Sequence, residues 1–188
     1  DIKAVHERPF ADVLADIEAA ELYDALWDFG LPQALNTSSV NAPAIKVFWA
    51  AQANRGDKGF LSKDITVRDM LTHHGDIHHI FPKNFLKKQG LPRSKYNQVA
   101  NYVYVQQEVN IKIGDTAPSA YMAKVFEQCQ QGVAHYGAII SLEDLKANLA
   151  ANCLPEDLCA YQSEQFEAFL AERRRLMAQK IKGYYWGL

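Results

Sequence analysis

The stretch DIHHIFP at residues 76–82 decides how the centre of this chain folds, because β-branched and aromatic residues crowd it up to Pro82. A second segment of that kind, YVYV, follows at 102–105. Such composition is typical of strands, so we predict one strand at 76–81 and another at 102–105. We also expect three short helices, at 84–88, at 94–100 and from 108 to at least 112.

Helical periodicity of apolar residues fills both flanks of this centre. It predicts helices at 10–27 (ending at Gly30 and Pro32), 43–55, 66–71, 119–131 and 166–181. Another helix is predicted to begin at 141, and a further region opens at Pro155. We therefore predict a mainly α protein with a small central β unit, an α+β fold. It would comprise a helical segment at 1–72, the central unit with its insert and following helix at 73–131, and C-terminal helices packed on the same domain at 132–188.

The composition is that of an ordinary globular protein. Of 188 residues, 48% are apolar and 22% are charged, and the net charge is −2. No apolar run reaches the roughly 18 residues that span a membrane, so we expect no membrane partner and a cytoplasmic protein. The three cysteines (Cys129, Cys153 and Cys159) contain no C-x-x-C pair, which excludes a disulfide framework and fits a reducing compartment. Because the chain begins at Asp1 without a leader, we expect a piece of something longer.

Charge is unevenly distributed around the central stretch. No acidic residue occurs between Asp76 and Glu108, whereas five basic side chains fall there: Lys83, Lys87, Lys88, Arg93 and Lys95. A phosphate backbone requires such a basic strip, although a solvated loop would show the same pattern. These five residues and Lys112 are the candidate DNA contacts. The run Arg173-Arg174-Arg175 is expected on a solvated face of the last helix.

Two adjacent histidines and two later asparagines are the candidate functional residues: His78, His79, Asn101 and Asn110. A neutral imidazole near pH 7 can take a proton from an attacking water. A divalent cation held by few protein ligands can stabilise the charge that develops on a phosphate. The combination is therefore typical of metal-dependent hydrolysis of a phosphodiester bond.

The placement of these residues on a strand raises a difficulty. Neighbouring residues of a regular strand point to opposite faces, so both histidines can serve one site only if the strand breaks or bulges, which the nearby Pro82 permits. Asp76 would share a face with His78, where it could assist a metal or simply begin the strand. The other pair, His73-His74, is interpreted as the polar end of a helix.

These residues resemble the C-terminal nuclease region of GmrSD-type restriction endonucleases, with their HNH motif. The specific part of the resemblance covers residues 75–83, 96–97, 101–103, 110–114 and 118–121. The flanks at 28–31, 59–64 and 166–181 are similar to the helical segments around that motif, so the resemblance spans most of the chain.

The resemblance implies a ββα-metal (HNH, or His-Me finger) unit that cleaves DNA. It gives His79 the role of general base and makes His78 and Asn110 the metal ligands, with Asp76 as a further candidate. It also has Asn101 fix the loop beside His79. Magnesium is the expected ion. Many other HNH enzymes have Asp where His78 stands, so manganese, nickel and zinc stay open.

The resemblance also implies a setting. Such proteins usually carry an N-terminal ParB-like domain that binds or hydrolyses nucleotide, and many defend bacteria against phage DNA, often modified DNA. This chain has no Gly-rich phosphate loop, so nucleotide control and target choice are expected outside it. Two alternatives remain: a non-catalytic DNA-binding or subunit-docking module, and a nuclease acting on RNA, whose 2′-hydroxyl can itself attack. The oligomeric state is left open.

Overall fold

Two short strands form the centre of the computed structural model, which describes residues 2–73 and 75–188. β1 (Asp76–His79) pairs antiparallel with β2 (Tyr102–Val105), and the register places His78 opposite Val103 and His79 opposite Tyr102. β1 ends two residues before the predicted end. The reason is local: beyond His79 the backbone groups of Phe81 bond the Asn101 side chain instead of a neighbouring strand.

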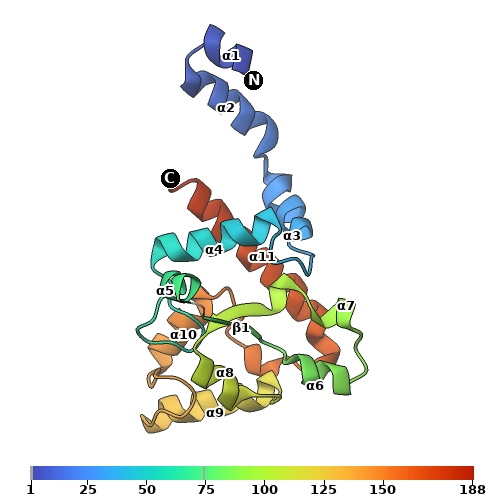
Figure 1. Ribbon diagram of the computed structural model, residues 1–188, viewed down its shortest axis with the longest axis vertical. Coiled ribbons are helices and arrows are strands. Elements are labelled where there is room, and N and C mark those ends of the chain that lie inside the picture. The colour runs from blue at the N-terminus through green and yellow to red at the C-terminus, as the bar shows by residue number, and fades with distance from the viewer. Residues whose placement is uncertain (1, 74) are drawn as a thin grey trace.

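Helices surround this small sheet, as Figure 1 shows. They are α1 (Ile2–Glu7), α2 (Phe10–Glu21), α3 (Leu31–Ala34), α4 (Pro43–Arg55), α5 (Val67–Thr72), α6 (Lys83–Lys88), α7 (Arg93–Tyr96), α8 (Gln107–Ile113), α9 (Pro118–Gln131), α10 (Leu142–Ala151) and α11 (Phe166–Tyr185). The long α11 crosses the molecule and packs against α4 and α3, whereas α1 and α2 extend from one end (Figure 1). The predicted mainly helical α+β fold is confirmed. In the part of the chain that is described, no helix combines the length and the apolar character needed to cross a membrane.

Local sequence signals set most helix ends where they were predicted. Thr66 and Asp69 form a capping box at the start of α5, and the Ser141 hydroxyl accepts a hydrogen bond from the Asp144 amide at the start of α10. Each satisfies backbone groups that a helix terminus leaves unpaired. Gly56 and Gly132 end α4 and α9 in the left-handed conformation that glycine adopts without strain. Of the predicted helix-terminal histidines, His73 caps α5, and His74 lies outside the described residues.

The predicted continuous helix at 10–27 is wrong. α2 ends at Glu21, and a π-helical turn (Leu26–Gly30) leads into α3. The break lets the chain turn so that Trp27 is buried beside Tyr185, with its indole N–H donating to the Leu22 carbonyl at 3.1 Å. Pro32 does not stop the helical path, because it lies in the first turn of α3, where its missing N–H has no intrahelical partner to lose.

A single apolar core joins the two flanks to the centre, running from Trp27 to Ile181. Phe81, just after β1, is fully buried against two residues of α11, Phe166 at 5.1 Å and Phe169 at 5.0 Å between ring centres. The segment that follows the two histidines is therefore anchored to the last helix.

The expectation that the triple arginine faces solvent is wrong for Arg173, whose exposed fraction is 0%. Its guanidinium donates to the backbone carbonyl of Ala100 at 2.8 Å and to that of Asn152 at 3.3 Å. Burial lowers the pKa of Arg173 to about 10. This side chain ties α11 to the segment immediately before Asn101.

Removing this buried guanidinium should cost far more stability than removing an exposed one. We expect Arg173→Ala to lower the free energy of unfolding by about 3 kcal/mol or more, because it leaves a cavity and two carbonyls without their donor. Arg175→Ala is the matched control on the same helix. Arg175 is paired only with Glu172 at the surface, so its loss should cost less than about 1 kcal/mol. Urea denaturation measures both, and equal effects would contradict the account.

Candidate active site

Both histidines of the central stretch line one cavity of about 200 Å³. Its walls come from the end of β1, the start of α6 and the end of α8: Ile77, His78, His79, Pro82, Lys83, Asn110, Gly114 and Asp115. The strand pairing is regular through His79, and β1 ends at that residue. Both histidines line the cavity because it lies at the end of β1, where Pro82 and α6 follow the strand.

A chain of hydrogen bonds links three predicted site residues. The Asp76 carboxylate accepts from the Asn110 amide nitrogen at 3.2 Å, which turns the amide oxygen of Asn110 toward His78. That oxygen lies 2.7 Å from Nδ1 of His78. Asp76 therefore orients the Asn110 side chain, and His78 and Asn110 are in contact at the cavity wall.

His78 is a buried, neutral imidazole. Its exposed fraction is 4%, and burial lowers its pKa to about 4, so it carries no charge at neutral pH. With Nδ1 paired to Asn110, the buried Nε2 has no hydrogen-bond partner among the described residues. A buried unpaired polar atom costs about 1–3 kcal/mol and calls for a functional explanation.

The donor set around His78 fits a divalent cation. An unprotonated imidazole and an amide oxygen are both metal ligands. His78 Nδ1 lies 2.7 Å from Asn110 Oδ1, and because an amide oxygen only accepts, the imidazole proton is on Nδ1 in this hydrogen bond. An ion held by these two atoms would replace the hydrogen bond, with the imidazole proton moving to Nε2, and their separation is close to the roughly 3 Å between adjacent ligands of an octahedral ion with bonds of about 2.1 Å. No three His, Cys, Asp or Glu side chains form a metal-binding group in residues 2–73 and 75–188.

His79 is held on two sides. Its Nε2 lies 3.0 Å from the side-chain oxygen of Asn97, and its ring packs edge-on against Tyr102 with 4.8 Å between ring centres. Burial lowers the pKa of His79, and the nearby Lys83 lowers it further, while the hydrogen bond to Asn97 acts in the opposite direction. A neutral imidazole at the cavity wall is what a proton acceptor requires.

Asn101 bonds the backbone of the loop that follows His79. Fully buried, its side-chain oxygen accepts from the Phe81 amide at 2.9 Å. Its amide nitrogen donates to the carbonyls of Phe81 at 3.1 Å and Tyr96 at 3.2 Å. One side chain thus joins both ends of the insert that carries α6 and α7.

The predicted DNA contacts lie on exposed surface, but only Lys83 lines the cavity. Lys88 pairs with Asp115 at 3.7 Å and Lys95 with Glu167 at 3.3 Å. Lys112 donates to the His135 carbonyl at 2.9 Å. Exposed pairs of this kind are weak, so these side chains can exchange partners with a phosphate.

Three residues of the site were not predicted from the sequence. Asn97 orients His79, Asp115 lines the cavity, and the Tyr121 hydroxyl donates to the Ile80 carbonyl at 3.0 Å. The pair Tyr96-Asn97 belongs to the family resemblance, and that is the one signal that could have pointed to Asn97.

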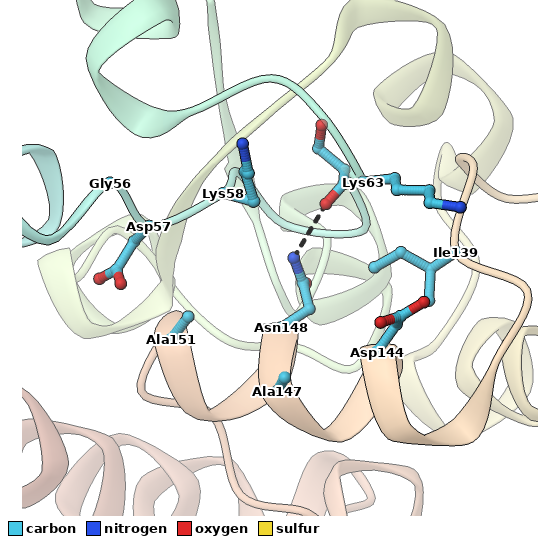
Figure 2. A pocket seen from close by; sticks show the side chains of 10 residues that line it. Gly56, Asp57, Lys58, Lys63, Ile139, Asp144, Ala147, Asn148 and Ala151 are labelled. Atoms are coloured by element: carbon cyan, nitrogen blue, oxygen red, sulfur yellow. Dashed lines mark hydrogen bonds between the residues drawn. The ribbon is translucent and has the colours of Figure 1, made fainter.

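A second cavity, of about 270 Å³, lies between the 56–63 segment and α10 and contains none of the predicted site residues (Figure 2). Its Asn148 donates to the carbonyls of Gly59 and Ser62, and its Asp57 pairs with Lys180. These polar groups hold the loop and α11 in place, so this cavity offers no comparable chemistry.

Comparison with known proteins finds one distant similarity to report. An uncharacterized protein of Methanocaldococcus jannaschii is 26% identical over 117 residues, a match that covers 55% of this chain. The chain spans only 20% of that relative's length. No family model matches the chain, and no solved structure matches it significantly. The family resemblance therefore stays a prediction.

Replacing Asn101 by its isosteric acid should disrupt the loop. Asn101→Asp keeps an acceptor for the Phe81 amide but places a carboxylate oxygen against two carbonyls that have lost their donor. We expect the free energy of unfolding to fall by about 2 kcal/mol or more, with faster proteolysis between residues 82 and 96. Asn54→Asp, at an exposed position of α4, is the control. Similar stabilities of the two variants would refute the role of Asn101.

Acid should destabilise the metal-free protein through His78. Its pKa in the folded protein, about 4, lies below the ordinary 6.5, so the unfolded chain binds the proton more strongly and stability is lost as pH falls from 6.5 toward 4. We expect the free energy of unfolding to drop by about 2 kcal/mol from pH 7 to pH 5, since one pKa unit corresponds to about 1.36 kcal/mol. Denaturation in EDTA measures this loss. His78→Gln should remove it, and an unchanged pH dependence in that variant would rule His78 out as the source.

Proposed function

We propose that this chain is a metal-dependent endonuclease domain of the HNH type that hydrolyses phosphodiester bonds in DNA. One observation carries the proposal: His79 and the His78–Asn110 pair line the same cavity, beside a loop that Asn101 fixes. The order β1, insert, β2, α8 supports assigning the centre as a ββα-metal unit.

The residues of the cavity can divide the reaction among them. His79, neutral at the cavity wall, accepts the proton of a water molecule as the water oxygen bonds to phosphorus. The bond from phosphorus to the departing sugar oxygen breaks, and that oxygen takes a proton from solvent. His78 and Asn110 would hold magnesium or a related ion, which when bound supplies positive charge to the phosphate and to the leaving oxygen. Asp76 keeps the Asn110 oxygen directed toward His78.

Charge around the site favours approach of DNA from the side of α6 and α7. Exposed Lys83, Lys87 and Arg93 lie on that side. A cleft beside the start of β1 has a lining that includes Asp64, Asp69, Asp76 and Glu108. These acids would repel a phosphate backbone, whereas the basic strip would attract it.

The cellular setting rests on the family resemblance alone. We propose that a ParB-like, nucleotide-dependent domain elsewhere in a longer cytoplasmic protein selects the target, and that the protein restricts phage DNA, including modified DNA. The small share of its relative that the chain covers leaves room for such a domain.

Nicking of a supercoiled plasmid in magnesium or manganese tests the activity. We expect the parent chain to nick and His79→Ala to be at least about a hundredfold slower, since a general base contributes roughly 10²–10⁴-fold. His6→Ala, an exposed histidine on α1, should match the parent, and EDTA should abolish nicking.

Three outcomes would contradict the proposal. Equal rates in His79→Ala and the parent would remove His79 from the reaction. DNA binding without any cleavage would favour a non-catalytic binding module, and metal-independent cleavage of RNA would favour a ribonuclease.

A further inference from the structure

We propose that Asn97 is a positioning residue that fixes the tautomer of His79 so that Nδ1 presents its lone pair to the cavity. The tautomer follows from the geometry of the two side chains. Its consequence for catalysis rests on the proposed nuclease function.

The contact is specific in its atoms. The side-chain oxygen of Asn97 lies 3.0 Å from Nε2 of His79. An amide oxygen can only accept a hydrogen bond, and a neutral imidazole carries a single N–H. The proton therefore resides on Nε2, and Nδ1 holds the lone pair.

The remaining nitrogen of His79 is accessible to solvent. Nδ1 has no hydrogen-bond partner among the described residues, and it is not among the atoms sealed from solvent. His79 lines the cavity with His78 and Asn110. A water between them would meet an acceptor at Nδ1, whereas the other tautomer would present an N–H and could take no proton.

Asn97 is itself held in place by the fold. It ends α7, where its backbone amide donates to the Arg93 carbonyl at 3.1 Å. The preceding residue, Tyr96, gives its carbonyl to the Asn101 side chain. Asn101 therefore fixes both the loop after His79 and the segment that carries the partner of His79.

Tyr102 restricts the ring in the other direction. Its ring packs edge-on against His79, with 4.8 Å between ring centres, and limits the movement of the imidazole on that side. Without the acceptor at position 97, the ring would return to the tautomer equilibrium of free histidine, a mixture in which Nε2–H is only the more common form, and it could turn about its last side-chain torsion, which has a broad energy profile.

Nitrogen NMR of the histidine rings tests the tautomer directly, whether or not the chain cleaves DNA. Protein labelled with ¹⁵N at histidine is compared in four forms: the parent, Asn97→Leu, Asn97→Asp and Asn54→Leu, with the His79 signals assigned by their loss in His79→Ala. We expect the Nε2–H tautomer in the parent, in Asn97→Asp, which keeps an acceptor, and in the exposed control Asn54→Leu. Asn97→Leu should show a mixture of tautomers. Should Asn97→Leu fail to fold, Asn97→Ala takes its place.

An Nδ1–H tautomer in the parent, or an unchanged Nε2–H tautomer in Asn97→Leu, would overturn the proposal.

Nicking assays then measure the effect of the tautomer on catalysis. We expect Asn97→Leu to lower kcat by about tenfold to a hundredfold with KM nearly unchanged, a share of the general-base contribution, and Asn97→Asp to retain most of the activity. If the parent does not nick, the nuclease proposal fails while the NMR result still decides the tautomer. Nicking by Asn97→Leu at the parent's rate would show that the tautomer does not matter for the reaction.

Discussion

The fixation of the loop by Asn101 is the constraint on which the rest of the site depends. A single buried amide satisfies three backbone groups, two on Phe81 and one on Tyr96. It replaces strand pairing at Phe81, so β1 ends close to the two histidines. The same contacts close the insert that brings Asn97 back to His79. Buried polar groups are tolerated only when they are satisfied, and here that requirement shapes the cavity.

Large helices around a two-stranded sheet explain how so small a β unit can hold these groups. A two-stranded sheet is marginal by itself, and Phe81 joins it to α11 through Phe166 and Phe169. Arg173 of the same helix bonds the carbonyl of Ala100, directly before Asn101. The C-terminal helix α11 thus supports the site through these contacts, without contributing a side chain to the cavity. The two imidazoles differ in their burial. His78 is shielded from solvent beside Asn110, whereas His79 keeps one nitrogen open to solvent.

Local features of the sequence were predictable, and long-range ones were not. The strands, α8 and the helix caps follow from composition and spacing within a few residues. The break after α2 was missed because it depends on Trp27 reaching Tyr185 at the far end of the chain. Arg173 looked solvated because its neighbours are, and only the packing of α11 shows that it is buried. Asn97 carries no periodic signal, since its role arises from the path of the insert. The nuclease function itself is still a prediction.

Anomalous diffraction from crystals of this chain grown with manganese would test the central claim most directly, because it locates the ion independently of any activity. We expect a manganese peak in the cavity, within about 2.3 Å of His78 and Asn110. Crystals in which manganese binds elsewhere on the protein while this cavity stays free of it would contradict the proposed metal site and, with it, the assignment of the cavity as a nuclease centre.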